Sequence, residues 1–188
     1  MLLQFPLSDR TAKRIYLFGG YMNGRFVPKR VFFTCGVGRS PDELTSFEMA
    51  LRDASIECYN IVTVSSILPP KCRIISKEEA LPDLPAGSIV FTVFSRLSSN
   101  EPHRRISASL GVAIPEDMES HWGYFTEHHS FGQGPEQVGR YAEKLAEDMF
   151  GSISESTLNR TMNVTKSAVV GDDGLWTSVI VAAVFLMD

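Results

Sequence analysis

Two adjacent serines stand where a β-branched stretch of the sequence meets a pair of prolines. Residues 60–65, Asn-Ile-Val-Thr-Val-Ser, have the composition of a β-strand, and Pro69-Pro70 cannot continue a strand ladder. A serine hydroxyl held against a peptide carbonyl in strained backbone can attack that carbonyl. Two hydroxyls at such a junction are unusual for a plain strand end, which makes the pair a candidate for chemistry. Ser-Ser pairs are common, however, and ordinary strand-end hydroxyls are the alternative.

Three histidines, His121, His128 and His129, lie close to Glu127 in the sequence and raise the question of a metal site. Their spacing fits no zinc pattern, and His128 and His129 would point to opposite faces of a strand. We therefore expect structural or pocket-lining histidines and no metal. The glycine-rich residues 131–134 follow no dinucleotide-binding fingerprint, so we expect a loop there.

Length and composition indicate one soluble domain. The chain has 188 residues, 44% hydrophobic and 21% charged, which is ordinary for a globular protein. A net charge of −4 favours neither a nucleic-acid nor a membrane partner. Three cysteines without CxxC spacing favour a cytoplasmic location over disulfides. The first residues lack the features of a signal peptide, and the apolar stretch 175–187 is too short to span a bilayer.

The pattern of apolar residues predicts many strands and two helices. Strands are expected at residues 30–37, 60–65, 88–97, 105–114, 123–127, 162–170 and 175–186, with hairpin turns at 21–24 and 171–174. Helices are expected after an N-cap at Ser40, and over 135–149. The apolar faces expected to meet the core are Leu44, Phe47, Leu51 and Ala54 in the first helix and Val138, Tyr141, Leu145 and Met149 in the second. The result is an α+β fold, an αββα-type sandwich of largely antiparallel sheets covered by helices.

Glu48 borders the apolar face of the first predicted helix, because it lies four residues after Leu44. A carboxylate at that border is either half-buried or used in binding. A solvated helix glutamate is the equal alternative.

Several short stretches together resemble the pyruvoyl-dependent arginine decarboxylases. They are Gly36-Val37-Gly38, Phe47-Glu48-Met49-Ala50-Leu51, Tyr59-Asn60-Ile61-Val62, Val64-Ser65-Ser66-Ile67-Leu68-Pro69-Pro70, Leu84-Pro85-Ala86-Gly87-Ser88, and Glu127. Their order and spacing fit from about residue 30 to the C-terminus. The resemblance therefore implies a decarboxylase domain over residues 30–188, preceded by an N-terminal extension over residues 1–29.

The resemblance implies a precursor that cuts itself. Ser66 Oγ would attack the carbonyl carbon of Ser65 to form an ester, and β-elimination would release Ser65 as a carboxylate. Hydrolysis of the remaining dehydroalanine would give ammonia and a pyruvoyl group. The products would be a chain of residues 1–65 and a chain of residues 66–188 that carries covalent pyruvoyl in place of PLP or a metal.

The resemblance also implies a reaction and roles for side chains. L-Arginine would form a Schiff base with the pyruvoyl ketone and lose CO2 to give agmatine. Asn60 would assist cleavage as an oxyanion donor, and Glu127 would donate a proton to the substrate, for which burial must raise its pKa. Glu48 stands where the family carries an aspartate that pairs with the guanidinium, so the depth of the pocket stays open. Weaker candidates for the pocket are Leu44, Leu51, Glu57 and Tyr59.

Assembly follows from the same resemblance. Proteins of this family form trimers, often paired into hexamers, with active sites between subunits. Two other functions remain open. One is a pyruvoyl decarboxylase for another amino acid, such as histidine or aspartate, although the Glu48 carboxylate favours a cationic side chain over aspartate. The other is an unprocessed binding or scaffold subunit.

Overall fold

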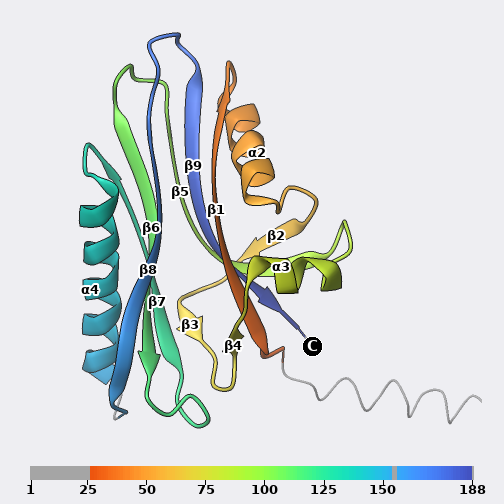
Figure 1. Cartoon of the computed structure of the whole chain (residues 1–188), viewed down its shortest axis with the longest axis vertical. Coiled ribbons are helices and arrows are strands. Elements are labelled where there is room, and N and C mark those ends of the chain that lie inside the picture. The colour runs from red at the N-terminus through yellow and green to blue at the C-terminus, as the bar shows by residue number, and fades with distance from the viewer. Residues whose placement is uncertain (1–25, 154–155, 188) are drawn as a thin grey trace, which may run out of the picture.

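The computed structural model describes residues 26–153 and 156–187, which form two packed β-sheets with a helix on each outer face (Figure 1). In chain order the elements are β1 (Arg30–Ser40), α2 (Glu43–Ala54), β2 (Asn60–Thr63), β3 (Ile67–Leu68), β4 (Arg73–Ile74), α3 (Lys77–Ala80), the 3-10 helix η1 (Leu81–Asp83), β5 (Ile89–Ser99), β6 (Arg105–Pro115), β7 (Gly123–Phe131), α4 (Pro135–Ile153), β8 (Leu158–Val169) and β9 (Trp176–Leu186). Within the described ranges, no helix is long and apolar enough to cross a membrane. The hairpin expected at residues 21–24 lies outside them.

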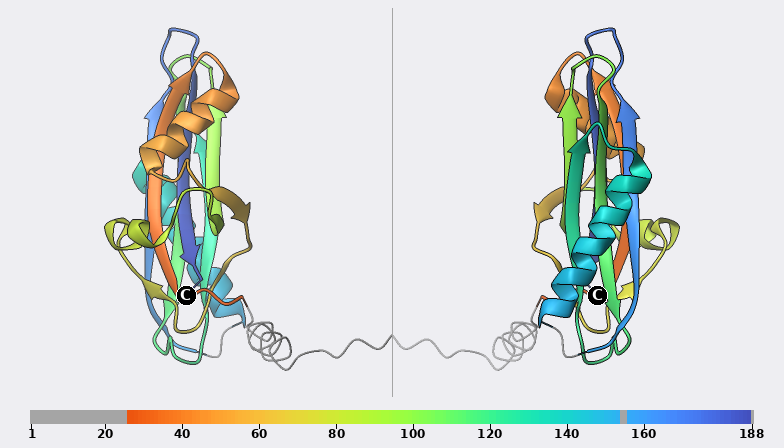
Figure 2. Two further views of the ribbon diagram at one scale, coloured as in Figure 1. Left: turned by 90° about the vertical axis from the view of Figure 1, so that its right-hand side faces the viewer. Right: turned by 90° about the vertical axis from the view of Figure 1, so that its left-hand side faces the viewer.

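The two sheets differ in size and share a mostly antiparallel pairing. The larger has the strand order β2-β5-β9-β1-β4 and the smaller has the order β3-β7-β6-β8. Only the short strands β2 and β4 pair in parallel, with β5 and β1 respectively. Helix α2 covers the outer face of the larger sheet and α4 covers that of the smaller (Figure 2). The predicted α+β sandwich of the αββα type is therefore confirmed.

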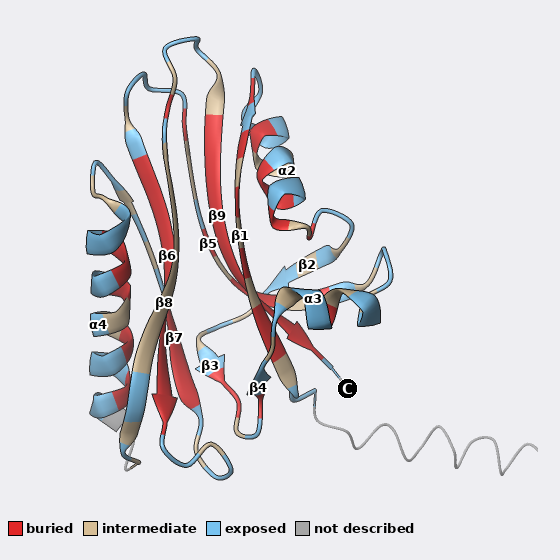
Figure 3. Cartoon of the chain, viewed as in Figure 1, coloured by how far each residue is buried: buried red, intermediate tan, exposed pale blue. Residues whose placement is uncertain are grey.

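The main hydrophobic core lies between the sheets, and each helix buries the side that faces its sheet (Figure 3). Phe125 of β7 is fully buried. Its ring packs edge-on against Phe185 of β9 at a centroid distance of 5.9 Å, and it meets the ring of Phe33 of β1 at a tilt, at 6.1 Å. Because this cluster joins strands of both sheets, it fixes the position of β7 relative to the larger sheet.

Glycines allow both helices to lie directly on strand backbone. A Cβ atom added at Gly38 of β1 would overlap the carbonyl oxygen of Ser46 in α2, and one added at Gly36 would overlap that of Ala50. A Cβ atom added at Gly111 of β6 would likewise overlap the carbonyl oxygen of Ala142 in α4. Helix α2 is therefore held at a fixed distance from β1 that no larger residue permits.

The start of α2 and one member of its predicted face differ from expectation. Its N-cap is Asp42, whose Oδ1 accepts a hydrogen bond from the Thr45 N–H at 2.9 Å. Ser40 cannot take that role because β1 continues through it, paired with Trp176. Leu44, which was predicted to face the core, is 75% exposed.

The apolar face of α4 is also displaced from its predicted position. Its fully or nearly fully buried residues are Val138, Ala142, Ala146 and Phe150. Tyr141 and Met149, which were predicted to be buried, are exposed. Ala142 faces Gly111, and the helix lies so close to the strand there that only small residues fit between them. The larger side chains of Tyr141 and Met149 therefore lie to the side of this contact.

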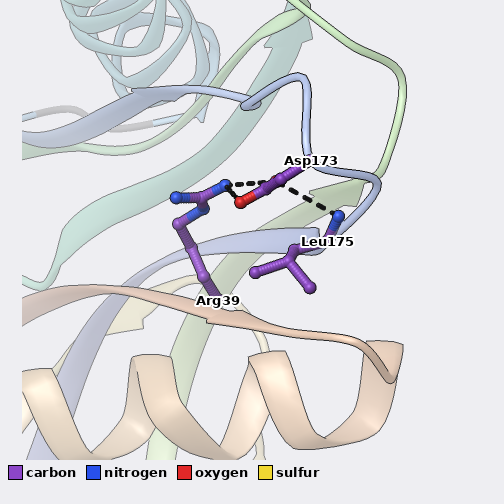
Figure 4. Close-up of polar contacts among 3 residues, drawn as sticks. All are labelled: Arg39, Asp173 and Leu175. Carbon is purple, nitrogen blue, oxygen red and sulfur yellow. Dashed lines mark hydrogen bonds and ion pairs between the residues drawn. The ribbon is translucent and has the colours of Figure 1, made fainter.

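The turn at residues 171–174 is a crossover between sheets and not the hairpin expected there, because β8 pairs with β6 whereas β9 pairs with β1 and β5. An ion pair joins this turn to the end of β1 (Figure 4). Arg39 Nη2 donates to both carboxylate oxygens of Asp173, at 2.7 and 2.9 Å. Asp173 Oδ1 also accepts from the Leu175 N–H at 3.3 Å. The pair is half-exposed, so its contribution to stability is small.

A pair of glycine substitutions tests the contact between α2 and β1. Gly38→Ala should lower the free energy of unfolding by about 3 kcal/mol, because the new methyl group overlaps helix backbone that cannot move independently. Gly151→Ala is the matched control in α4, where a Cβ atom meets only open space. It should leave stability unchanged or raise it by up to about 1 kcal/mol. Equal urea midpoints for the two variants would contradict this account.

Candidate active site

Residues 64–66 connect the two sheets, and we call them the bridging segment. The Val64 N–H donates to the Thr92 carbonyl of β5 at 3.0 Å, which extends the pairing of β2 in the larger sheet. The Ser66 carbonyl accepts from the Phe125 N–H of β7 at 2.8 Å, which extends the pairing of β3 in the smaller sheet. Val64, on one side of Ser65, is therefore bound to the larger sheet, and Ser66 is bound to the smaller sheet. The Ser65–Ser66 peptide bond is held between these two hydrogen bonds.

The chain after Ser66 is firmly packed. Leu68 and Pro69 are buried, and β3 ends before the proline pair, as the sequence predicted. Lys71 then adopts a left-handed conformation with φ of 63°, and its N–H donates to the Met118 carbonyl at 2.7 Å. Neither serine has a positive φ, so the left-handed backbone lies in the turn beyond the two serines.

The two serines differ in exposure: Ser65 is exposed and Ser66 is half-buried. A hollow of about 260 Å³ adjoins Ser65 and is mostly apolar; we call it the Ser65 hollow. Its lining residues are Phe26, Pro28, Val64, Ser65, Ile67, Pro69, Phe91, Phe185 and Met187. There is room beside the bridging segment for a small molecule to approach it.

Glu127 lies on the same strand as the residue that binds Ser66. It follows Phe125 by two positions, so both point to the same face of β7, about 7 Å apart along the strand. Burial raises the pKa of the Glu127 carboxyl above its ordinary value, although part of the side chain is open to solvent. The structure thus brings Glu127 near Ser66 with the direction of pKa shift that a proton donor requires.

The three histidines are separated from one another. His128 packs its ring on Tyr141 of α4 at a centroid distance of 4.6 Å, and the strand alternation directs its neighbour His129 to the opposite face. His121 Nδ1 lies 3.5 Å from Asp117 Oδ2 in the loop before β7. In the part of the chain that the structure describes, no three potential metal ligands gather at one point.

Two adjoining cavities run along α2 and the outer face of β5, and we call them together the α2 groove. Their volumes are about 490 and 580 Å³, and both are lined by Phe47 and Arg96. The other lining residues are Asp42, Glu43, Leu44, Leu97 and Ser98 in one, and Leu51, Tyr59, Asn60, Ile61, Thr63 and Phe94 in the other. Four residues predicted from the sequence, Leu44, Leu51, Tyr59 and Asn60, therefore share this groove.

Asn60 does not approach the Ser65–Ser66 bond of its own chain. It begins β2, where its N–H donates to the Ser88 carbonyl at 2.8 Å and its Nδ2 donates to the Gly87 carbonyl at 2.9 Å. Val64 is four extended residues further on, about 13 Å away. One chain alone therefore keeps the predicted cleavage assistant apart from the bond it would assist.

Two other predicted residues, Glu48 and Glu57, lie outside the lining of the groove, whereas Tyr59 lines it. Glu48 accepts a hydrogen bond from Arg52 Nε at 3.1 Å, one turn along α2, and both side chains are substantially exposed. Glu57 is exposed in the turn after α2. Tyr59 donates its hydroxyl to the Leu84 carbonyl at 3.2 Å, and burial, assisted by Cys58, raises its pKa.

Sequence reasoning missed an aromatic and cationic cluster in the α2 groove. The Arg96 guanidinium lies 4.8 Å from the centre of the Phe47 ring, and Phe47 meets Phe94 edge-on at 6.0 Å. A single arginine in a strand otherwise made of apolar and hydroxyl residues was an available signal. Its alternation with buried Ser95 directs it to the outer, solvent-facing side of the sheet.

Comparisons with known proteins cover nearly all of this structure. A sequence model described as "Pyruvoyl-dependent arginine decarboxylase" matches residues 30–188. A protein of that name from Methanocella arvoryzae is 58% identical over 88% of this chain and 100% of its own length. Similar proteins from Methanosarcina mazei and Thermoplasma volcanium, named pyruvoyl-dependent arginine decarboxylase 1 and pyruvoyl-dependent arginine decarboxylase, are 47% and 46% identical over 87% of this chain and 98% of their own lengths.

Proposed function

The chain belongs to the pyruvoyl-dependent arginine decarboxylase family, and on that premise we propose that it cuts itself between Ser65 and Ser66 and converts L-arginine to agmatine and CO2. The observation that carries the proposal is the bridging segment, which holds Ser66 between the two sheets and beside the strand of Glu127. The names of the relatives favour arginine over other amino acids, and they favour an enzyme over a scaffold subunit.

In the proposed self-cleavage, the bonds that form and break belong to Ser65, Ser66 and water. The Ser66 Oγ attacks the Ser65 carbonyl carbon, the peptide C–N bond breaks, and the nitrogen takes up the hydroxyl proton, which leaves an ester and a free amine. Loss of the Ser66 Cα proton and cleavage of the Cβ–Oγ bond then release the Ser65 carboxylate and leave dehydroalanine. Addition of water to its imine tautomer releases ammonia and leaves a ketone. The hydroxyl of Ser66, its fixed carbonyl and the nearby Glu127 fit a group formed at this position.

The two products should remain one folded unit. The 1–65 chain contains β1, α2 and β2, and the 66–188 chain contains all other elements. All eleven residues of β1 pair with β9, and β1 lies between β9 and β4 in the larger sheet. Removing one covalent link therefore leaves the strand ladder and the core between the sheets in place.

Paired serine substitutions test the assignment of the nucleophile. Ser66→Ala removes the attacking hydroxyl, so the purified protein should remain a single chain on a denaturing gel and release no CO2 from arginine. Ser65→Ala is the control, because it keeps the backbone carbonyl that is attacked and alters only an exposed side chain. It should still be cut at the same bond. A Ser66→Ala protein that is cut would exclude Ser66 as the nucleophile.

Once formed, the pyruvoyl group supplies a ketone that binds the substrate amine and accepts the electron pair left behind by CO2. We assign to Glu127 the delivery of a proton to the substrate Cα. Partial burial raises the pKa of its carboxyl, so a larger fraction is protonated at a given pH than for a fully solvated glutamate, although Glu127 is itself exposed. The position of Glu127 on β7, near the anchored Ser66, supports this assignment.

The Glu127 assignment predicts a defined pH dependence. Because the protonated carboxyl is the active form, turnover should fall as pH rises through the raised pKa of Glu127. Glu127→Gln should lower kcat by about 10²–10⁴-fold and remove that alkaline decline. CO2 release per cut chain, with the cut fraction read from a gel, provides the measurement. Turnover of Glu127→Gln at the wild-type level would rule out the role.

We propose that Glu48 pairs with the substrate guanidinium. Its carboxylate is partly exposed and already binds a guanidinium-type group, that of Arg52 in the same helix. Arg96 lines the α2 groove, where its positive charge disfavours a second cation. The guanidinium of arginine is therefore placed towards Glu48, and its α-amine points away from Arg96.

The separation of Asn60 from Ser66 supports an active site shared between subunits. In this proposal one subunit supplies the α2 groove, with Asn60 and Tyr59, together with Glu48 on α2, and its neighbour supplies Ser66 and Glu127. We propose that three such contacts close a ring into a homotrimer, the assembly that the family resemblance implies, and that two trimers can pair into a hexamer. The Asn60 amide of the partner subunit is then available to the developing oxyanion on Ser65.

A mixed assembly tests the shared site. Asn60→Ala alone should be cut slowly, because the amide donor is missing from every interface. Co-expressed with Ser66→Ala, the tagged Asn60→Ala chain receives an intact Asn60 from its neighbour and should regain cutting. A Ser66→Ala chain that also carries Asn60→Ala is the matched control and should give no recovery. If Ser66→Ala partners leave the tagged chain uncut as well, the shared site is wrong.

A further inference from the structure

The elimination step of self-cleavage has an electrostatic requirement of its own. When the Ser66 Cα proton leaves, the electron pair spreads onto the adjoining Ser66 carbonyl oxygen before the Cβ–Oγ bond breaks. The Cα proton of a peptide is weakly acidic, so the step needs a donor directed at that oxygen. This donor is distinct from the one that assists the earlier attack on Ser65.

The structure contains such a donor. The Phe125 N–H donates to the Ser66 carbonyl oxygen at 2.8 Å. The bond lies one position beyond β3, whose two residues pair with Tyr124 and Gly123 of β7. Strand β7 is itself paired along its length with β6, so the donor belongs to a rigid strand and not to a loop.

Packing fixes this donor further. Phe125 is fully buried. Its ring contacts the rings of Phe33 and Phe185, which come from two strands of the other sheet. An N–H that is fixed in advance and surrounded by apolar groups stabilises a developing charge more than a solvent-exposed donor does. The bond also survives cutting, because the reaction does not consume the carbonyl of residue 66.

We propose that the backbone N–H of Phe125 is a catalytic group of self-cleavage that stabilises the charge on the Ser66 carbonyl oxygen during elimination; this inference rests on the proposed function. In that step the Cα proton passes to water and the Cα electron pair forms the new double bond. The Cβ–Oγ bonding pair leaves with the Ser65 carboxylate. Without the donor, the attack of Ser66 still occurs, but the ester accumulates.

The experiment replaces residue 125 with phenyllactic acid by nonsense suppression, which removes the N–H and keeps the ring. Elimination should slow by about 10²-fold or more, the magnitude found when one oxyanion donor is removed. The accumulated ester has the mass of the uncut chain but is opened by hydroxylamine. The new C-terminal fragment then begins with serine at residue 66 and not with pyruvoyl. Cutting at the substituted 124–125 linkage gives different fragment masses.

The matched control removes the other anchor of the bridging segment. Replacing Val64 with 2-hydroxyisovaleric acid deletes the Val64–Thr92 hydrogen bond, which does not touch the Ser66 carbonyl. This variant should accumulate no ester between Ser65 and Ser66, and hydroxylamine cutting at its own 63–64 ester linkage gives different fragment masses. Only folded assemblies isolated by gel filtration are scored, with trimethylamine N-oxide added to restore folding where it is lost.

The outcomes separate the inference from the function on which it rests. Ester accumulation in the 125 variant alone supports the donor. Equal accumulation in both variants means that the bond is only an anchor and overturns the inference, as does pyruvoyl formation at the wild-type rate in the 125 variant. If the unmodified protein itself stays uncut, self-cleavage fails and the inference fails with it.

Discussion

Two backbone hydrogen bonds, one to each sheet, position the peptide bond at which we propose that this protein cuts itself. They hold Val64 to β5 and Ser66 to β7, so the peptide bond between Ser65 and Ser66 crosses the gap between the two sheets. The strands that produce this arrangement are short, with four residues in β2 and two in β3. Their positions are set by long neighbours, β5 and β7, which the core between the sheets keeps in place. The bond of the proposed cleavage is thus placed accurately without a long strand of its own.

The same architecture separates the site into two parts. The α2 groove lies on the outer face of the larger sheet, and Ser66 lies where the chain passes between the sheets. Glycines at positions 36 and 38 bring α2 against β1, so the groove has a rigid wall. This separation is the physical reason for proposing that neighbouring subunits complete one another's sites.

Much of the fold follows from local pattern. Strand runs rich in β-branched residues and the amphipathic pattern of α4 were sufficient to predict the αββα sandwich. The errors arose where tertiary pairing overrides local preference. Ser40 has the chemistry of an N-cap but is held in β1 by Trp176, and Tyr141 is displaced from the buried face because Gly111 accepts only a small residue opposite it. The turn at 171–174 has the composition of a hairpin, yet composition does not reveal that its two strands belong to different sheets.

The sequence indicated candidate site residues, but it could not indicate how they are arranged. Ser66 and Glu127 come from distant parts of the sequence, and only the pairing of β3 with β7 shows that they are close. The distance of Asn60 from Ser66, the cluster at Arg96 and the donor at Phe125 depend on backbone positions that no motif encodes.

The most direct test of the central claim is the intact mass of the purified wild-type protein under denaturing conditions. The account predicts two species, residues 1–65 with a free carboxylate and residues 66–188 lighter by one ammonia than a chain that begins with serine. A single species at the mass of the full sequence would contradict it.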